Sequence, residues 1–305
     1  MKKNLILGIA DNYSYFDLIR FFKSLSKVNF QGHICIFIGP NNKPDLVYNL
    51  KNKKIELISY RLDFPFIDTP HPDNFPSLPS PIHIYNYRHF MYYNYLLENG
   101  EEYDNVLLTD IKDVIFQKDP FDFTIEDALY VAIEAHIISD CIWTKQWLLA
   151  GYDKEVLDRI KNKRVTCAGT TMGPTEQIKR YLKIMLTAIV ATNDAVNCVD
   201  QAIQNVLLYQ GVLEPTIRLH NEEGIIVTVG TDDPSKYNYN SQGCLLNQKG
   251  YPALTIHQAD RHPAMLQKLD KFIFKQPFPL SIIKPIYDAC PVFRNIVQIS
   301  RNLWR

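Results

Sequence analysis

The chain has 305 residues, of which 46% are hydrophobic and 22% charged, a balance typical of a globular protein with a substantial core. Its 33 basic and 33 acidic side chains cancel, which argues against a dedicated nucleic-acid-binding protein and against a disordered polyelectrolyte. The six cysteines are scattered without a C-x-x-C pair, so we expect no disulfide framework and a cytoplasmic protein. No apolar run approaches the roughly 20 residues of a membrane span.

The first part of the chain alternates predicted strands and helices. Residues 4–10 form a continuous apolar run typical of a buried strand. This run stops at Asp11 without a cleavage pattern, so we expect a strand there and no signal peptide. Residues 16–25 carry large apolar side chains at helical spacing, and strands are predicted at 33–38 and 54–60.

Residues 65–81 contain six prolines and predict a long surface loop. Further helices are predicted at residues 85–97, 144–160, 175–191 and 200–209. Further strands are predicted at residues 105–110, 129–135, 224–230 and 253–257. The alternation predicts an α/β fold, a mostly parallel sheet flanked by helices. We expect one domain over residues 1–262 and a C-terminal extension over 263–305.

Chemically useful side chains follow several of the predicted strands. Asp11 follows the first strand, Asp110 and Asp113 follow the fourth, and His257 ends the last. Ligands bind beyond the carboxyl ends of strands in open α/β sheets. Two carboxylates three residues apart suit a hard divalent cation that also binds substrate phosphates, and an added imidazole favours Mn²⁺. Such a site could stabilise a diphosphate leaving group, although surface aspartates that cap turns are also common after strands.

The segment at residues 105–121, NVLLTDIKDVIFQKDPF, resembles the metal-binding segment of GT-A glycosyltransferases. In that family an apolar strand leads into an Asp-x-Asp element, which an apolar tripeptide and an Asp-Pro pair follow. Asp113 is similar to the second aspartate, because the tripeptide and the Asp-Pro pair follow it at the family's spacing. Ile111 occupies the position of the first aspartate, and Asp110 is displaced from it by one residue.

Two N-terminal features resemble the glycogenin-like retaining members of this family. The turn with Ala10, Asp11 and Tyr13 is similar to their nucleotide-binding turn, which implies contacts with the base and ribose. Arg88, in the Tyr-rich predicted helix, is similar to the arginine that approaches the donor, and a guanidinium can bind a diphosphate through paired hydrogen bonds. The residues alone equally allow an ion pair between Arg88 and a nearby acid.

Two C-terminal features continue the resemblance in the family's order along the chain. Asp200 and Gln201, with Asn205 after them, resemble the Asp-Gln pair that lies beside the donor sugar in these enzymes. His257 is similar to the histidine that completes the metal site. Arg261 stands near the place of the lysine that holds the diphosphate in the family.

The resemblance implies a metal-dependent transferase that moves a sugar from a nucleoside-diphosphate donor, most often a UDP-sugar, to a glycan or another hydroxyl acceptor. Mn²⁺ or Mg²⁺ would be held by Asp110, Asp113 and His257, and the anomeric configuration would be retained. A base at Glu134 or Asp140 would instead favour inversion.

The walls of the acceptor pocket are expected in two segments. One is the proline-rich loop at residues 64–81, and the other is the segment at 165–173. The small residues Ala168, Gly169 and Gly173 of the second segment permit close approach of a ligand.

Two other functions stay open at this point. The first is a metal-dependent nucleotidyltransferase or phosphohydrolase. Phosphatases with an aspartyl nucleophile have Asp-x-Asp after the first strand, whereas Asp11 is followed here by Asn12 and Tyr13. The second is a catalytically degenerate, transferase-like binding or assembly protein, which the displaced Asp110 suggests.

The net charge of zero is a cancellation between two parts of the chain. Residues 263–305 carry seven basic and two acidic side chains together with six aromatic ones. The other 262 residues carry 26 basic and 31 acidic side chains. The basic, aromatic extension predicts either a peripheral contact with the inner face of a membrane or docking on the acidic domain.

Overall fold

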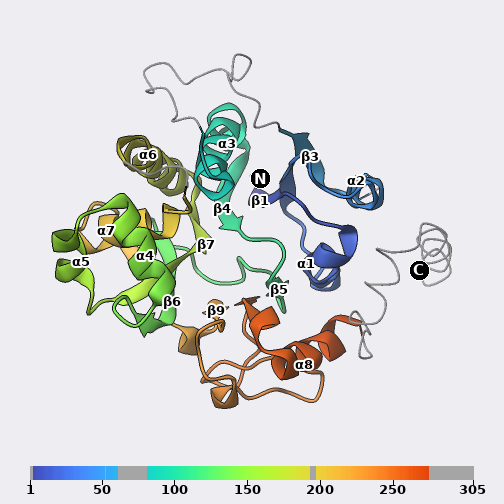
Figure 1. Ribbon diagram of the computed structural model, residues 1–305. Helices are drawn as coiled ribbons and strands as arrows, with labels where there is room; N and C mark the ends of the chain where they lie inside the picture. The colour runs from blue at the N-terminus through green and yellow to red at the C-terminus, as the bar shows by residue number, and fades with distance from the viewer. Residues whose placement is uncertain (1–2, 52, 61–80, 193–196, 275–305) are drawn as a thin grey trace.

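The computed structural model describes residues 3–51, 53–60, 81–192 and 197–274, and its centre is a seven-stranded β-sheet (Figure 1). The strands lie in the order β3-β2-β1-β4-β7-β6-β8. Neighbouring strands are parallel except at β7, which is antiparallel to both β4 and β6. The strands are β1 (Lys3–Ala10), β2 (His33–Ile38), β3 (Glu56–Ser59), β4 (Tyr103–Thr109), β6 (Leu129–Ile137), β7 (Arg164–Pro174) and β8 (Thr216–Leu219).

The chain order reverses inside the sheet, between β1 and β4. From β1 the chain builds outward to β2 and β3, and it then returns to the other side of β1 as β4. These two strands run parallel, with Leu7 opposite Leu108. Such a reversal leaves a crevice beyond the carboxyl ends of the two strands, where ligands bind in open α/β sheets. The segments that follow β1 and β4 begin with Asp11 and Asp110, so these residues flank the crevice.

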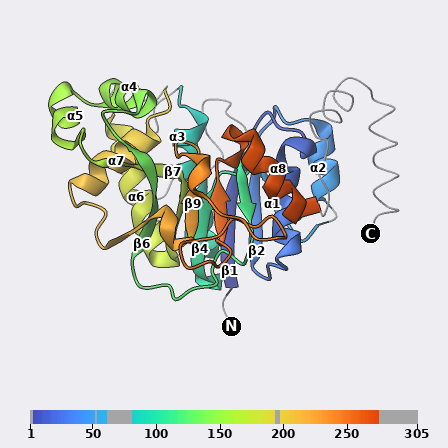
Figure 2. The same cartoon turned by 90° about the horizontal axis from the view of Figure 1, so that it is seen from below.

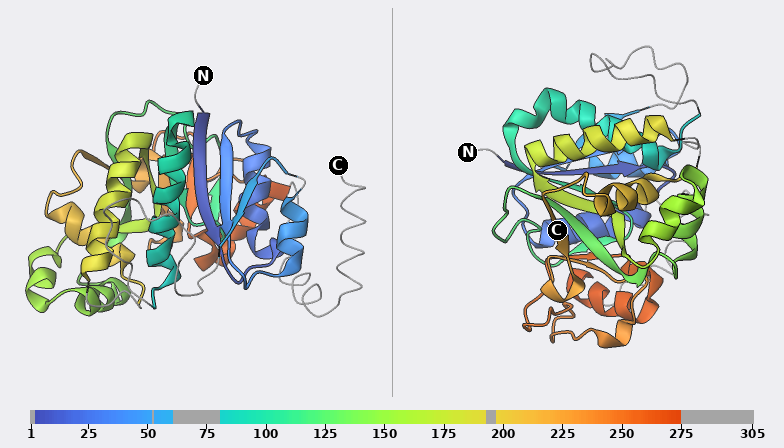
Figure 3. Two further views of the ribbon diagram at one scale, coloured as in Figure 1. Left: turned by 90° about the horizontal axis from the view of Figure 1, so that it is seen from above. Right: turned by 90° about the vertical axis from the view of Figure 1, so that its left-hand side faces the viewer.

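Alternation along β1 divides the core into two layers. Leu5, Leu7 and Ile9 point to one face of the sheet, whereas Ile6 and Ala10 point to the other. Figure 3 shows α3 and α6 over the first face and α1 and α8 on the opposite side. The helices of the first face are α3 (Ile84–Asn99), α6 (Thr175–Ala191) and α7 (Asp200–Tyr209). The other side holds α1 (Tyr15–Lys27) and α2 (Pro44–Leu50). The prediction of a single α/β domain with a mostly parallel sheet flanked by helices is confirmed.

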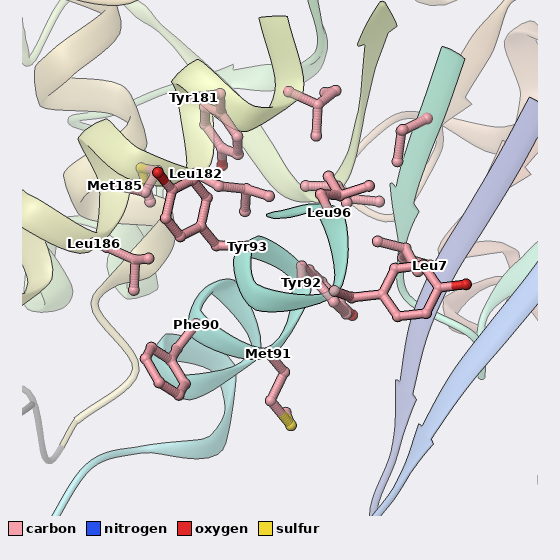
Figure 4. Packing of buried hydrophobic residues seen from close by; sticks show 14 of the residues in the cluster. Leu7, Phe90, Met91, Tyr92, Tyr93, Leu96, Tyr181, Leu182, Met185 and Leu186 are labelled. Atoms are coloured by element: carbon pink, nitrogen blue, oxygen red, sulfur yellow. The ribbon is translucent and has the colours of Figure 1, made fainter. Parts of the chain in front are cut away.

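Helix α3 is buried on two sides, which explains its unusual content of tyrosine. Tyr92 points toward Leu7 of β1, whereas Tyr93 points toward Met185 of α6 (Figure 4). A helix enclosed in this way is apolar around most of its circumference. Tyrosine supplies the apolar ring and a hydroxyl that can find a partner when buried, as Tyr95 does with a 2.7 Å hydrogen bond to Glu56.

A second, three-stranded sheet lies on the α1 side of the molecule. It consists of β5 (Val114–Phe116), β10 (Thr255–His257) and β9 (Ile226–Thr228), in that order. Strand β10 pairs antiparallel with β5, so that His257 lies opposite Val114. The backbone N–H of Gln258 then donates a 2.9 Å hydrogen bond to the carbonyl of Asp113. This pairing carries His257 to the end of the Asp110–Asp113 segment, although the two are far apart in sequence.

Helix α8 (Pro263–Phe274) is the described part of the C-terminal extension, and it docks on α1. Arg20 donates hydrogen bonds of 2.7 and 2.8 Å to the two carboxylate oxygens of Asp270. Lys27 donates to the carbonyl of Phe272, whose side chain is buried. Residues 275–305 lie outside the described part of the chain. So does the predicted proline-rich loop, apart from its last residue.

Several short elements were not predicted. Strands β5 and β8 and helix α2 have three, four and seven residues, too few for a clear apolar period. The predicted helix at 144–160 is two helices, α4 (Ile142–Gly151) and α5 (Lys154–Ile160), because Asp153 caps α5 by accepting from the N–H of Val156. The segment at 165–173 is the central part of β7. Within the described residues, no helix is long and apolar enough to cross a bilayer.

Candidate metal and nucleotide site

Three side chains able to hold a metal ion meet beyond the end of β4. Asp110 directly follows β4, Asp113 directly precedes β5, and His257 ends β10. The His257 Nε2 atom is 3.6 Å from Asp110 Oδ2 and 3.7 Å from Asp113 Oδ1. One ligand atom from each residue lies within 4.8 Å of the other two. The structure therefore brings together all three residues that were predicted as metal ligands.

His257 is buried, and one of its two ring nitrogens has no hydrogen-bond partner in the described structure. Its side chain is 0% exposed, and Nε2, the nitrogen that faces the two carboxylates, has no hydrogen-bond partner in the described structure. The other ring nitrogen, Nδ1, lies 3.6 Å from the Cys167 sulfur. A buried polar atom without a partner is costly, and a cation between the imidazole and the carboxylates would supply one.

Gly169 of β7 leaves the space in which these side chains meet. A Cβ atom at this position would lie 2.5 Å from Asp110 Oδ2 and 2.8 Å from His257 Cε1. The backbone at the same residue holds the site together, because the carbonyl of Gly169 accepts a 2.7 Å hydrogen bond from the N–H of Asp110. Any larger residue would displace the side chains that could hold a cation.

The electrostatics of the site follow from the partly buried carboxylates of Asp110 and Asp113, the buried carboxylate of Asp200 and the buried guanidinium of Arg88. Burial by itself raises the pKa of Asp110, but Arg88 and His257 outweigh it and bring that pKa below its usual value. Burial raises the pKa of Asp113, and the charge of Asp110 adds to this effect. Burial disfavours the charged form of His257, yet Cys167, Asp113 and Asp110 together raise its pKa well above the ordinary value. The carboxylates therefore give the site negative charge, which suits a cation.

Arg88 links this site to the start of α7. Its guanidinium donates hydrogen bonds of 2.6 Å to Asp110, 2.7 Å to Asp200 and 3.1 Å to the carbonyl of Ala168. Coulombic contact with the two carboxylates raises the pKa of Arg88 despite burial. Of the two roles considered for Arg88, the ion pair with neighbouring acids is present. Contact with a diphosphate stays a prediction.

A cavity of about 220 Å³ lies at the crevice between β1 and β4. It is lined by Ile9, Asp11, Tyr13, Ile84, Tyr85, Asp110, Ile111, Lys112 and Asp113. Asp11 lines this cavity, although its Oδ1 atom is buried beside Gly39, and the Tyr13 hydroxyl bonds to that of Tyr85. The carbonyl of Ala10 already accepts hydrogen bonds from the backbone N–H of Gly39 and the Asn42 amide. Of the predicted turn, Asp11 and Tyr13 thus face the cavity.

A second cavity, of about 210 Å³, lies on the α7 side of the same carboxylates. It is lined by Tyr85, Arg88, Asp110, Asp113, Trp147, Cys167, Ala168, Gly169, Cys198, Asp200, Gln201, Gln258 and Arg261. Tyr85, Asp110 and Asp113 belong to both cavities. Two of the three candidate metal ligands therefore stand between two spaces, which suits a ligand made of two parts, whereas His257 is buried and lines neither cavity.

The predicted Asp-Gln pair faces the second cavity, whereas Asn205 has a structural role. Asp200 accepts from Arg88 through one oxygen and from the N–H of Gln201 through the other. The Gln201 side chain accepts from the N–H of Ala168 at 3.4 Å and donates to Thr144 at 3.3 Å. Asn205 hydrogen-bonds to the backbone of β7 and fastens α7 to the sheet.

The two residues considered as bases for an inverting reaction are not among the described residues that line either cavity. Glu134 lies inside β6, and burial raises its pKa. Asp140 is exposed and accepts a hydrogen bond from Ser139. Gly173 also lies away from the cavities, since a Cβ there would meet the carbonyl of Ala128.

Sequence reasoning missed four residues of the second cavity, namely Tyr85, Trp147, Cys198 and Gln258. A signal existed for Tyr85, because it lies three residues before Arg88 and so shares its helix face. Nothing in the local sequence marks Trp147, whose position depends on how α4 packs against α7. The orientation of a helix relative to its neighbours is a property of the whole fold.

No model of a known protein family matches the chain, and no curated protein matches its sequence. The description of the protein therefore rests on its fold and on its candidate site. The fold is an α/β domain whose strand order reverses between β1 and β4. At that reversal stand two carboxylates that line both cavities and a buried histidine beside them, and these three side chains could hold a divalent cation.

Proposed function

We propose that the protein is a glycosyltransferase of the GT-A class that moves a sugar from a nucleoside-diphosphate donor to a hydroxyl acceptor. The donor that we expect is a UDP-sugar. The observation that carries this proposal is that Asp110 and Asp113 line both cavities, with the buried His257 within ligand distance of both carboxylates. A nucleotide-sugar has the matching layout, with a nucleoside at one end, a sugar at the other and a diphosphate between them.

The donor set fits Mn²⁺ or Mg²⁺. Two carboxylate oxygens and one imidazole nitrogen are ligands that small divalent cations accept, and the nitrogen favours Mn²⁺. Such a cation, when bound, would neutralise the negative charge that develops on a departing diphosphate. The orphaned Nε2 of His257 and the space beside Gly169 support the fit.

The first cavity suits a nucleoside. The Asp11 carboxylate, which lines this cavity, would accept a hydrogen bond from a base N–H or a ribose hydroxyl. Tyr13 and Tyr85 supply aromatic rings against which a base could lie. These residues line the space directly beside Asp110 and Asp113, which would put the attached phosphates next to the cation.

The second cavity suits the sugar and its acceptor. Arg261 is exposed at its edge and would add positive charge to the diphosphate. Gln201 would contact the sugar, and the Asp200 carboxylate, held by Arg88, would stabilise positive charge at the reacting carbon. Both oxygens of Asp200 already accept hydrogen bonds, so it is poorly placed to remove a proton. This favours a retaining reaction in which the leaving phosphate takes the proton of the acceptor.

The test is a screen of nucleoside-diphosphate sugars against the full-length protein with Mn²⁺ and with a chelator. We expect a UDP-sugar to raise the melting temperature only with the metal, since a ligand at about 100 times its Kd stabilises the folded state by about 2.7 kcal/mol. Slow release of UDP should accompany binding. Asp113→Ala and His257→Ala should lose both effects, whereas Asp158→Asn, on the exposed surface of α5, should keep them.

Two outcomes would contradict the proposal. If no nucleoside-diphosphate sugar binds or is hydrolysed with Mn²⁺, the transferase assignment fails. If a donor binds but no acceptor and no water ever receives its sugar, the protein is a binding module of the same fold. A nucleotidyltransferase or phosphohydrolase would instead release inorganic phosphate or diphosphate from a nucleotide without a sugar.

A further inference from the structure

The outer face of α4 carries three large apolar side chains that are exposed to solvent in the described structure. Ile142 is 59% exposed, Trp143 is 62% exposed and Leu149 is 52% exposed. Helical spacing puts these three side chains on one side of α4, whereas Thr144 and Leu148 point the other way and are buried against β7 and α7. Large apolar side chains gathered in this way mark an interaction site on a soluble domain.

We propose that this face of α4, defined by Ile142, Trp143 and Leu149, docks on an anionic lipid surface. Aliphatic side chains insert into the acyl region, and indole rings favour the boundary between headgroups and acyl chains. A saccharide platform would use the indole but would leave Ile142 and Leu149 exposed to water. A lipid surface accounts for all three.

The charge around α4 is complementary to such a surface. Residues 140–164 hold six basic and four acidic side chains, although residues 1–262 as a whole hold 26 basic and 31 acidic ones. Glu155 pairs with Arg159 and Asp158 pairs with Lys161, which leaves four basic and two acidic side chains outside these pairs. Each basic side chain near an anionic surface strengthens binding by roughly fivefold.

The position of α4 connects this face to the candidate site. Figure 2 shows α4 and α5 at the end of the molecule opposite the N-terminus, which is the end where β1 and β4 finish. Trp147 lines the second cavity, and its ring lies 6.5 Å from that of Trp143. Docking would therefore set the second cavity beside the lipid surface. The acceptor would then be a hydroxyl carried on a lipid, a step that rests on the proposed function, whereas docking itself does not.

The test measures binding of the full-length protein to vesicles, without nucleotide or metal. Vesicles of phosphatidylcholine with 30% phosphatidylserine are compared with pure phosphatidylcholine, at low and high salt. We expect the combined variant Ile142→Ser, Trp143→Ser, Leu149→Ser to bind the anionic vesicles at least tenfold more weakly than the wild type. Tyr48→Ser and Tyr251→Ser remove equally exposed side chains elsewhere and should not change binding. The extension 263–305 is present in every variant, so its contribution is common to all.

A second measurement locates the contact. Trp304→Phe leaves Trp143 and Trp147 as the two tryptophans of the chain. Vesicles with brominated acyl chains should then quench the fluorescence of the bound protein. The proposal is overturned if the wild type does not bind, if the combined variant binds equally well, or if bound protein is not quenched. Loss of binding to a water-soluble glycan with unchanged vesicle binding would also overturn it, and would assign the face to a saccharide.

Because these measurements contain neither donor nor metal, their failure would leave the proposed transferase activity untouched. Conversely, vesicle binding without turnover of any donor would support the lipid surface and refute the transferase. The two proposals can therefore fail separately. Substitution of exposed residues is not expected to unfold the domain, and a circular dichroism melt of each variant checks this.

Discussion

Arg88 donates a 2.6 Å hydrogen bond to Asp110, and this contact joins the buried face of α3 to the candidate metal site. The same guanidinium holds Asp200 at the start of α7. Helix α3, the segment after β4 and the start of α7, which are distant in sequence, therefore meet at the Arg88 guanidinium. The pairing lowers the pKa of Asp110 below its usual value and holds Asp200 in place.

Loss of Arg88 should destabilise the domain strongly. In Arg88→Ala, Asp110 and Asp200 lose their shared counter-charge, and removal of one partner from a buried pair costs about 3–5 kcal/mol. Urea unfolding of the metal-free protein measures this change. Arg159→Ala, which removes an exposed ion pair with Glu155, should leave the free energy of unfolding almost unchanged. Equal effects of the two substitutions would contradict the assigned role of Arg88.

Cation binding should strengthen as the pH rises. His257 must be neutral to coordinate a metal ion, and its neighbours raise its pKa above the ordinary value of 6.5. Below that raised pKa a proton therefore competes with the metal, and the apparent affinity for Mn²⁺ should fall by about tenfold per pH unit. Isothermal titration between pH 6 and pH 8.5 would measure the slope. An affinity that does not change over this range would show that His257 is not a ligand.

Gly169→Ala should weaken cation binding while the fold persists. The added Cβ would lie 2.5 Å from Asp110 Oδ2, so the carboxylate must move away from His257. We expect Mn²⁺ to bind at least about tenfold more weakly, as ligand geometry is lost. Gly100→Ala is the matched control, because a Cβ there meets its nearest neighbour at 3.3 Å and lies far from the site. Normal Mn²⁺ binding by Gly169→Ala would mean that the cation sits elsewhere.

His89 should make the domain less stable in mild acid. Burial, together with the charge of Arg88, lowers the pKa of His89 to about 4, against about 6.5 in the unfolded chain. Between these values the unfolded state binds a proton that the folded state does not, so stability is complete above pH 6.5 and falls as the pH drops toward 4. From pH 7.5 to pH 5.0 the loss from this residue is about 2 kcal/mol.

Urea unfolding at the two pH values tests this, with His89→Gln as the comparison. Glutamine keeps an N–H donor for the backbone carbonyls that His89 contacts, but it does not titrate. The variant should therefore lose less stability than the wild type over the same interval. An identical loss in both proteins would show that other groups cause the acid sensitivity.

The local pattern of the sequence was sufficient for the main elements and for the residues of the candidate metal site. The apolar run of β1, the boundaries of α6 and α7, and the aspartates after β4 are visible because strand and helix periods are local properties. The order of the motifs along the chain was also enough to select Asp110, Asp113 and His257 together. The sequence pattern did not predict short elements such as β5, because three residues are too few to show the period of a strand.

What only the tertiary structure decided is how distant segments meet. Antiparallel pairing of β10 with β5 brings His257 to Asp113, and no property of either segment alone specifies that partner. Packing of α3 against the sheet directs Arg88 into an ion pair, where the sequence allowed two roles. Packing of α4 on α7 turns Trp143 outward and sets Trp147 at the second cavity. Such contacts depend on the burial of apolar surface across the whole domain, which no local pattern records.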